Sequence, residues 1–134
     1  MSEIFSGSWA FQKAENYEEF LKALDLGFIK RKVALQMKPT LVFSFEGDEM
    51  RFQSNSAVKS SDVTYTLGGE QPDQAPTGDD GVQVWSIEGE KMIGVFTFAR
   101  NGNKIEICRT VVDGVLVQEM SFSGKSSTRF FKKE

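Results

Sequence analysis

From about residue 40 onward, apolar and polar residues alternate in short segments that are separated by glycine-containing turns. Alternation at a period of two, with a turn about every 8–12 residues, is typical of an antiparallel all-β meander. Asn101-Gly102 and Asp113-Gly114 are the strongest turn signals, because both positions of a tight hairpin turn favour positive φ. With a further segment near the start of the chain, the pattern predicts ten strands over residues 5–14, 40–46, 50–54, 60–67, 71–75, 82–88, 91–99, 104–111, 115–122 and 127–132.

Residues 16–37 follow a helical pattern instead. Asn16 followed by Glu19 predicts a capping box at the start of a helix. Apolar residues then recur at helical spacing, as Phe20, Leu21 and Leu24. After a glycine, a second short helix is predicted over residues 28–36, and Pro39 prevents it from extending further.

Ten strands are more than an open single-layer sheet exposes safely, so we expect the sheet to close into a barrel. A barrel of eight strands already holds one small ligand, so one of ten strands is expected to have a larger interior. The predicted fold is an all-β, ten-stranded antiparallel up-and-down β-barrel with a helix-turn-helix lid between the first two strands. Residues 1–134 are expected to form a single domain.

The amino-acid composition excludes several classes of active site and binding site. The chain has no histidine, which excludes histidine-based catalytic triads and histidine-ligated metals. Its single cysteine, Cys108, excludes an internal disulfide and cysteine-rich zinc sites and suits a reducing compartment. A net charge of −3 argues against a nucleic-acid partner. We therefore expect no metal, no cofactor and no nucleic acid.

The sequence also argues against export and against a membrane span. The first residues resemble neither a signal peptide nor a myristoylation site. No apolar run approaches the ~18 residues that a transmembrane helix needs. An intracellular protein is expected.

Two arginines share strand faces with apolar residues. On the predicted strand 104–111, Arg109 alternates in phase with Ile105 and Ile107, and on the last strand Arg129 is in phase with Phe131. An arginine inside an apolar interior is costly unless it is paired, and two together would attract an anion such as a carboxylate. Alternation leaves open that both arginines are exposed strand residues, since both faces of the last strand carry a phenylalanine.

The chain resembles the intracellular lipid-binding proteins, and among them the fatty-acid-binding proteins. The residues that carry the resemblance are Phe5-Ser6-Gly7-Ser8-Trp9, Glu15-Asn16-Tyr17, Phe20, Gly27-Phe28, Arg31-Lys32-Val33-Ala34, Lys38-Pro39, Gly47-Asp48, Asp79-Asp80 and Ser127-Thr128-Arg129. The match covers nearly the whole chain and is poor around residues 70–81, where two prolines predict a short strand. The resemblance implies a calycin-like barrel, no enzymatic activity, and monomeric, non-covalent transport of long-chain fatty acids in the cytoplasm.

The resemblance also implies site residues. The ligand carboxylate is expected at Arg109 and Arg129, with Phe131 where relatives usually carry a tyrosine, so one hydroxyl donor is missing. Cavity-lining positions are expected at Tyr17, Phe20, Met37, Pro39, Val58, Gln118 and Met120.

A basic face is expected on the lid, formed by Lys22, Lys30, Arg31 and Lys32. It is either a solvated helix face or a surface for transient contact with anionic membranes. The resemblance adds nuclear import, through Lys22, Arg31 and Lys32. The alternative functions are a carrier of retinoic acid or another carboxylate lipid, and a membrane-associating lipid-binding protein. An enzyme would need an inward-facing carboxylate with a raised pKa, and no convincing pair is present.

Overall fold

Antiparallel strands form most of the computed structural model, which describes residues 2–134. The strands are β1 Gly7–Glu15, β2 Thr40–Glu46, β3 Glu49–Asn55, β4 Ser60–Thr66, β5 Gln71–Gln74, β6 Asp80–Glu88, β7 Lys91–Phe98, β8 Lys104–Val112, β9 Val115–Phe122 and β10 Lys125–Lys133. Helices α1 Tyr17–Ala23 and α2 Phe28–Gln36 lie between β1 and β2, and a short 3-10 helix, Ser2–Phe5, precedes β1.

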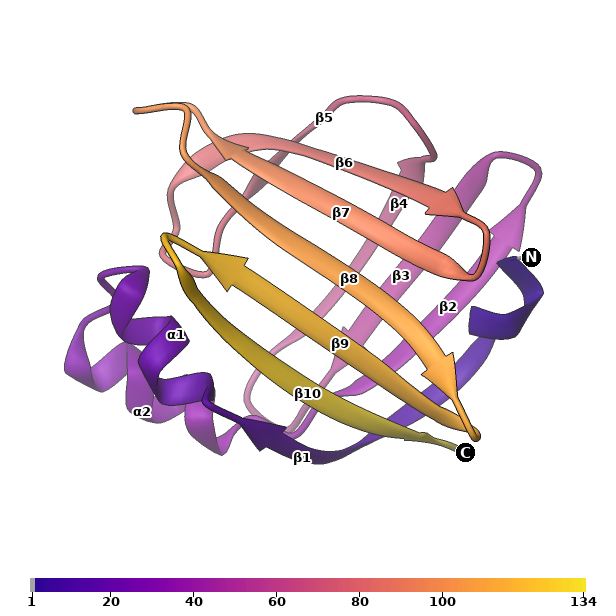
Figure 1. The fold of residues 1–134 in the computed structure, drawn as a ribbon, viewed down its shortest axis with the longest axis horizontal. Coiled ribbons are helices and arrows are strands. Elements are labelled where there is room, and N and C mark those ends of the chain that lie inside the picture. The colour runs from indigo at the N-terminus through magenta and orange to yellow at the C-terminus, as the bar shows by residue number, and fades with distance from the viewer. Residues whose placement is uncertain (1) are drawn as a thin grey trace.

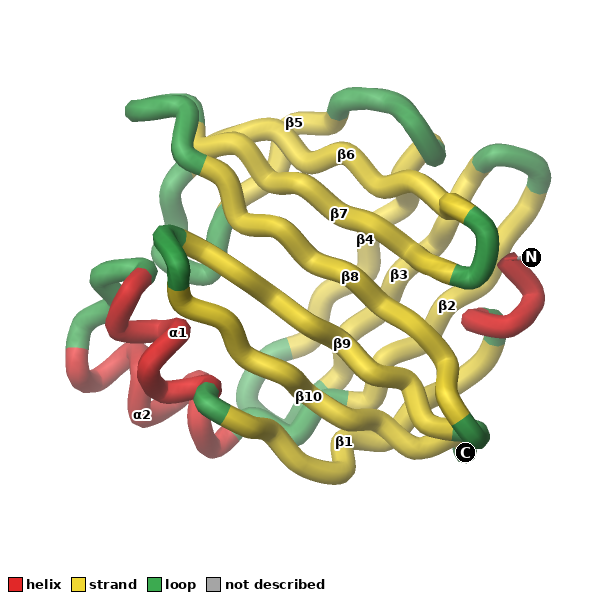
Figure 2. Tube along the Cα trace, viewed as in Figure 1, coloured by secondary structure: helices red, strands yellow, loops and turns green. Residues whose placement is uncertain are grey.

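The strands form one sheet in the order β4-β3-β2-β1-β10-β9-β8-β7-β6-β5. Pairing of the first strand with the last wraps this sheet into a nearly closed barrel, in which the β1–β5 part lies behind the β6–β10 part in the view of Figure 1. Both helices lie at one end of the barrel beside the β9–β10 turn, and the two chain ends lie at the other (Figures 1 and 2). The predicted ten-stranded barrel with a helical lid is confirmed.

Two local predictions at the start of the chain are wrong. Phe5 belongs to the 3-10 helix rather than to β1: the backbone N–H of Ser6 donates to the carbonyl oxygen of Glu3 at 3.1 Å, and β1 begins only at Gly7. Asn16 does not cap α1 with its side chain: it has a positive φ of 58°, and its amide donates to the carbonyl oxygen of Ser126 at 2.7 Å. Glu19 instead forms an ion pair with Lys22.

The short strand predicted near residues 71–75 is present as β5. It has only four residues, and Pro72 is paired in register with Val82 of β6. Because β5 is at the end of the sheet order, the missing proline N–H faces an edge and interrupts no central ladder.

The interior is divided into two apolar clusters. One cluster, hereafter the lower cluster, contains Phe5, Trp9, Leu41, Phe43, Met50, Tyr65, Trp85, Met92, Leu116 and Phe131. The other, the lid cluster, contains Phe20, Leu21, Leu24, Leu26, Ala75, Phe96, Phe98, Ile105 and Met120. Helix α1 is therefore anchored by its apolar face, as the helical spacing of Phe20, Leu21 and Leu24 predicts, whereas α2 buries none of its side chains.

We predict that Gly94→Ala destabilises the barrel. A Cβ at this position would lie 2.5 Å from the ring of Trp85, which is buried in the lower cluster. Overpacking of this kind lowers the free energy of unfolding by about 1–3 kcal/mol, which urea denaturation measures. The control is Gly69→Ala, whose Cβ would approach no atom closer than 3.4 Å. Equal stability of the two variants would contradict the prediction.

Candidate functional site

Three polar side chains form a row across the middle of the sheet. Arg109 of β8 is paired in register with Gln118 of β9, and Gln118 is paired in turn with Arg129 of β10. Two tight turns determine this register: Asp113-Gly114 joins β8 to β9, and Ser123-Gly124 joins β9 to β10. All four turn residues have positive φ, as hairpin turns matched to strand twist require. The row follows from the position of these turns.

Three aromatic rings surround the guanidinium group of Arg109 inside the barrel. It is 3% exposed, and its Nε donates to Oε1 of Gln118 at 2.6 Å. Its guanidinium carbon lies 4.5 Å from the ring centre of Trp85, 4.8 Å from that of Phe52 and 5.1 Å from that of Phe43. Cation–π attraction to these three rings offsets part of the cost of removing the charge from water.

Arg129 lies on the other side of Gln118 and is less fully partnered. It is 8% exposed, and its buried Nε has no hydrogen-bond partner. Its guanidinium carbon is 4.7 Å from the ring centre of Tyr17, 5.2 Å from that of Phe11 and 5.4 Å from that of Phe131. Tyr17 packs against the lid cluster and Phe131 belongs to the lower cluster, so this arginine lies between the two.

The two arginine charges are not neutralised by the protein. Within residues 2–134, neither guanidinium forms an ion pair with an aspartate or glutamate. Burial lowers the pKa of Arg109 to about 9, with a smaller contribution from the charge of Arg129. Burial also lowers the pKa of Arg129. At neutral pH Arg109 remains charged, so the interior holds positive charge that an anion would compensate.

The other predicted site residues are distributed between the interior and the rim. Gln118 and Met120 of β9 and Phe20 of α1 are buried, and Phe131 is fully buried against Phe11, with ring centres 5.8 Å apart. Phe131 therefore provides an apolar surface and no polar group. Met37 is half-buried, and Pro39 is buried in the connection from α2 to β2.

The prediction that Val58 lines the cavity is corrected. This residue lies in the turn between β3 and β4 and is 57% exposed. The Ser56 hydroxyl, which accepts hydrogen bonds from the backbone N–H groups of Val58 and Lys59, shapes the turn. The valine side chain is therefore exposed to solvent at this turn.

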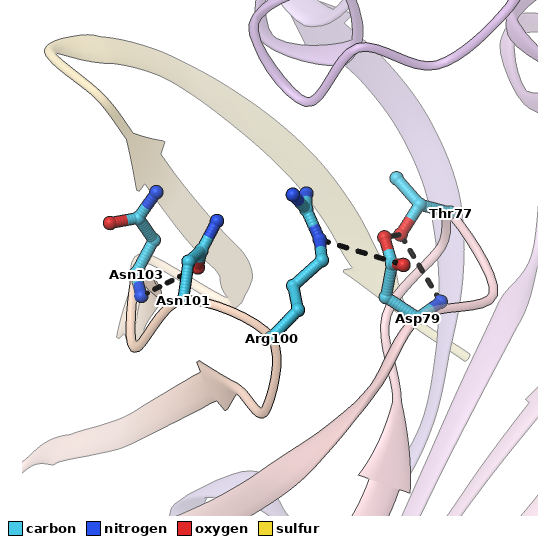
Figure 3. A network of polar contacts seen from close by, with 5 residues as sticks. All are labelled: Thr77, Asp79, Arg100, Asn101 and Asn103. Atoms are coloured by element: carbon cyan, nitrogen blue, oxygen red, sulfur yellow. Dashed lines mark hydrogen bonds and ion pairs between the residues drawn. The ribbon is translucent and has the colours of Figure 1, made fainter.

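An open depression of about 590 Å³ lies at the lid end of the barrel. It is lined by Asp25, Leu26, Gly27, Phe28, Ile29, Lys30 and Thr77. On its far side, the β5–β6 loop is held by a polar network: the Thr77 hydroxyl donates to Asp79 at 2.6 Å, and Asp79 pairs with Arg100 at 3.6 Å (Figure 3). The depression separates the α1–α2 turn from this loop, so it marks the place where the lid meets the barrel rim.

The four basic residues of the lid do not form one uniform face. Lys22, Lys30 and Lys32 are exposed, and Lys22 pairs with Glu19 at 3.6 Å. Arg31 is partly buried, and its guanidinium donates to the carbonyl oxygen of Leu26 at 2.7 Å. Arg31 therefore joins α2 to the segment between α1 and α2 through this hydrogen bond.

Sequence reasoning missed the residues that surround the arginines. Phe43, Phe52 and Trp85 come from β2, β3 and β6, and meet Arg109 of β8 across the barrel interior. Strand alternation predicts that these three side chains face the interior. It does not predict their contact with Arg109, because that contact depends on how the two parts of the sheet face each other.

Comparison with known proteins identifies the family. The Lipocalin / cytosolic fatty-acid binding protein family matches residues 6–134, and the chain belongs to this family. The intestinal fatty acid-binding protein of Mus musculus is 32% identical over 130 residues, which cover 97% of this chain and 98% of that protein. The Bos taurus protein of the same name is 30% identical with the same coverage. The family and these relatives are named for binding, which confirms the prediction that the chain is not an enzyme.

Solved structures show the same fold. The apo form of lipid binding protein 8 from Caenorhabditis elegans has a TM-score of 0.92 at 25% identity, covering 100% of this chain and 98% of the other. A Schistosoma mansoni fatty acid binding protein in complex with arachidonic acid has a TM-score of 0.90 at 20% identity, with coverage of 97% and 96%. Within residues 2–134, no helix has the length and apolar character needed to cross a bilayer.

We predict that Arg109→Met makes the ligand-free protein more stable. The change removes a buried charge that lacks an acidic partner and keeps an unbranched side chain among the aromatic rings. Replacing buried charge by apolar groups of similar volume is neutral or stabilising by about 1–4 kcal/mol, which urea denaturation of delipidated protein measures. The control is Arg51→Met, at an exposed arginine paired with Asp62, where little change is expected. A less stable Arg109→Met variant would contradict the prediction.

Proposed function

We propose that this protein binds a long-chain fatty acid inside the barrel and holds its carboxylate at Arg109, Gln118 and Arg129. The observation that carries the proposal is the pair of buried arginine charges without an acidic partner in residues 2–134, one on each side of Gln118. A guanidinium offers paired donors that match the two oxygens of a carboxylate. A carboxylate placed there would neutralise charge and provide an acceptor for the unpartnered Nε of Arg129.

We expect the acyl chain to pack against apolar residues next to this site. The lid cluster contains Phe20, Phe96 and Met120, and the Gln118 side chain donates to the sulfur of Met120 at 3.6 Å. Burial of the chain against these residues contributes about 0.8 kcal/mol for each CH₂ group, so chain length adds steadily to affinity. Admission of the ligand requires α1 and α2 to move relative to the β5–β6 loop, at the depression between them.

The names of similar proteins support this ligand class. The Mus musculus and Bos taurus relatives are called intestinal fatty acid-binding proteins, and one protein of the same fold is described in complex with arachidonic acid. The family name describes its members as cytosolic, and we assign this chain to the cytoplasm. Because Phe131 lacks a hydroxyl, the polar contacts to the carboxylate are expected from the two arginines, Gln118 and ordered water.

Native mass spectrometry tests the ligand class. Delipidated protein is offered a mixture of oleic acid, retinoic acid and retinol, and retention of oleic acid over the other two is expected. Preferred retention of retinoic acid would mean that the natural ligand is a carboxylate lipid other than a fatty acid. Equal retention of retinol would mean that the arginines do not select an acid, and the proposal would be abandoned.

A matched pair of ligands tests the arginine site. We predict that Arg109→Met weakens binding of oleate about tenfold to a hundredfold, because a charged hydrogen bond contributes about 1.5–3 kcal/mol. Binding of oleyl alcohol, which has the same chain and no charge, is expected to change little. Titration calorimetry measures both affinities, with Arg51→Met as the control arginine variant. An equal loss for acid and alcohol would show that the substitution damaged the cavity and removed no carboxylate contact.

We also propose that the lid makes transient contact with anionic membranes. Helix α2 buries no side chain, and its first two residues are among the most exposed apolar side chains: Phe28 is 64% exposed and Ile29 is 76% exposed. Lys30 and Lys32 follow them directly and are also exposed. Apolar side chains that can enter a bilayer surface, next to basic residues that attract acidic headgroups, favour membrane contact over a merely solvated helix.

Vesicle flotation tests this contact. We predict that Lys30→Glu/Lys32→Glu lowers retention on phosphatidylcholine vesicles containing phosphatidylserine by roughly tenfold or more, since each basic residue near the surface contributes about 1 kcal/mol. The control, Lys91→Glu/Lys132→Glu, makes the same change of net charge on β7 and β10, near the end of the barrel away from the lid (Figure 1). Equal losses in the two double variants would show that net charge, and not the lid, governs retention.

A further inference from the structure

The wall of the barrel lacks a backbone ladder at one place, between β4 and β5. These two strands stand at opposite ends of the sheet order, so no backbone pairing joins them. Side-chain hydrogen bonds cross the opening instead. The Tyr65 hydroxyl of β4 donates to Oδ2 of Asp73 in β5 at 2.7 Å, and the Gln71 side chain of β5 donates to the carbonyl oxygen of Thr64 at 3.0 Å.

The two hydrogen bonds differ in their surroundings. The bond from Gln71 is exposed to solvent. Tyr65 is 6% exposed and belongs to the lower cluster, with its hydroxyl directed to the half-buried Asp73. A buried tyrosine hydroxyl needs a hydrogen-bond partner, and Asp73 provides it where no backbone group of β5 does. The Tyr65–Asp73 bond is therefore the inner connection across the opening.

Tyr65 is connected to the arginine site through one aromatic ring. The rings of Tyr65 and Trp85 meet edge to face, with centres 6.2 Å apart, and Trp85 lies 4.5 Å from the guanidinium carbon of Arg109. Burial and the hydrogen bond to Asp73 raise the pKa of the Tyr65 phenol, so the hydroxyl stays protonated and remains a donor. The opening between β4 and β5 is thus separated from Arg109 by the side chains of Tyr65 and Trp85.

We propose that Tyr65 and Asp73 are positioning residues for the carboxylate site: their hydrogen bond closes the wall between β4 and β5 and keeps bulk water from entering beside Trp85 and Arg109. Attraction between a guanidinium and a carboxylate is stronger where bulk water is excluded than where it enters, even when ordered water molecules remain at the site. The bond therefore acts on ligand affinity through Trp85 and Arg109, without touching the ligand. This effect on affinity rests on the proposed fatty-acid function, whereas the closure itself is a property of the ligand-free protein.

The closure is tested first without ligand. Both tryptophans, Trp9 and Trp85, are replaced biosynthetically by 5-fluorotryptophan, and the shift of each ¹⁹F signal between H₂O and D₂O reports its contact with water. We expect Tyr65→Phe and Asp73→Ala to increase this shift for Trp85 and to leave Trp9, which donates to the carbonyl of Phe5, unchanged. The matched control is Gln71→Ala, which removes the exposed hydrogen bond across the same opening and is expected to change neither signal.

Conservative replacement separates the hydrogen bond from the charge. Asp73→Asn keeps an acceptor oxygen for Tyr65 and removes the negative charge, so the Trp85 signal is expected to match that of the unaltered protein. A Trp85 shift that stays unchanged in folded Tyr65→Phe protein would overturn the closure. A shift in Asp73→Asn as large as in Asp73→Ala would also overturn it, because the charge and not the hydrogen bond would then exclude water.

The effect on ligand binding is measured on the same variants. Tyr65→Phe is expected to weaken oleate binding roughly fivefold to tenfold, as for loss of one hydrogen bond acting on a charged site, and to weaken oleyl alcohol binding less. If a variant shows increased water contact at Trp85 but unchanged affinity for oleate, Tyr65 and Asp73 are not positioning residues for the carboxylate site. Failure of the unaltered protein to bind oleate would overturn the proposed function and leave the ¹⁹F result standing.

Discussion

Two guanidinium groups lie inside this barrel without an acidic partner in residues 2–134, and much of the interior can be understood from how their charges are accommodated. Aromatic faces surround Arg109, and Gln118 accepts its Nε hydrogen. These contacts reduce the cost of burial but do not neutralise the charge, and burial lowers the pKa of both groups. Under the proposed function, a ligand carboxylate would neutralise this charge, so the buried arginines would lower the stability of the ligand-free protein and favour binding.

The two apolar clusters and the lid helices form the rest of the structure around the buried arginines. Arg109 lies among rings of the lower cluster, Phe43 and Trp85, whereas Arg129 contacts Phe131 of the lower cluster and Tyr17 beside the lid cluster. Helix α1 is held by its buried apolar face, whereas α2 buries no side chain, so the two halves of the lid are fastened unequally. Movement of α2 therefore costs less buried apolar surface than movement of α1. The exposed apolar start of α2 lies beside the depression through which we propose that ligand passes.

Much of this could be predicted from the sequence, because local signals determine it. Strand alternation and turn residues were sufficient to predict the ten-stranded barrel, and the turns at Asp113-Gly114 and Ser123-Gly124 place Arg109, Gln118 and Arg129 in one row.

The predictions that failed did so because tertiary contacts outweighed the local sequence pattern. Asn16 fits a capping pattern, but its side chain finds the carbonyl of Ser126 instead. The aromatic surround of Arg109 is assembled from strands distant in the chain, which no periodicity encodes. Val58 was assigned to the cavity by resemblance alone, and its side chain is exposed at the turn between β3 and β4.

The central claim is that a ligand carboxylate neutralises the buried arginines, and its ionisation tests this most directly. The ¹³C signal of carboxyl-labelled oleate bound to the protein is followed by NMR as pH is lowered. A carboxylate beside a buried guanidinium stays ionised well below the usual carboxyl range near about 4–5, because the positive charge stabilises the anion. We expect the bound signal to remain that of the carboxylate until the protein unfolds, and to become titratable in Arg109→Met. A bound carboxyl that titrates in the usual range in the unaltered protein would place the headgroup away from the arginines and contradict the account.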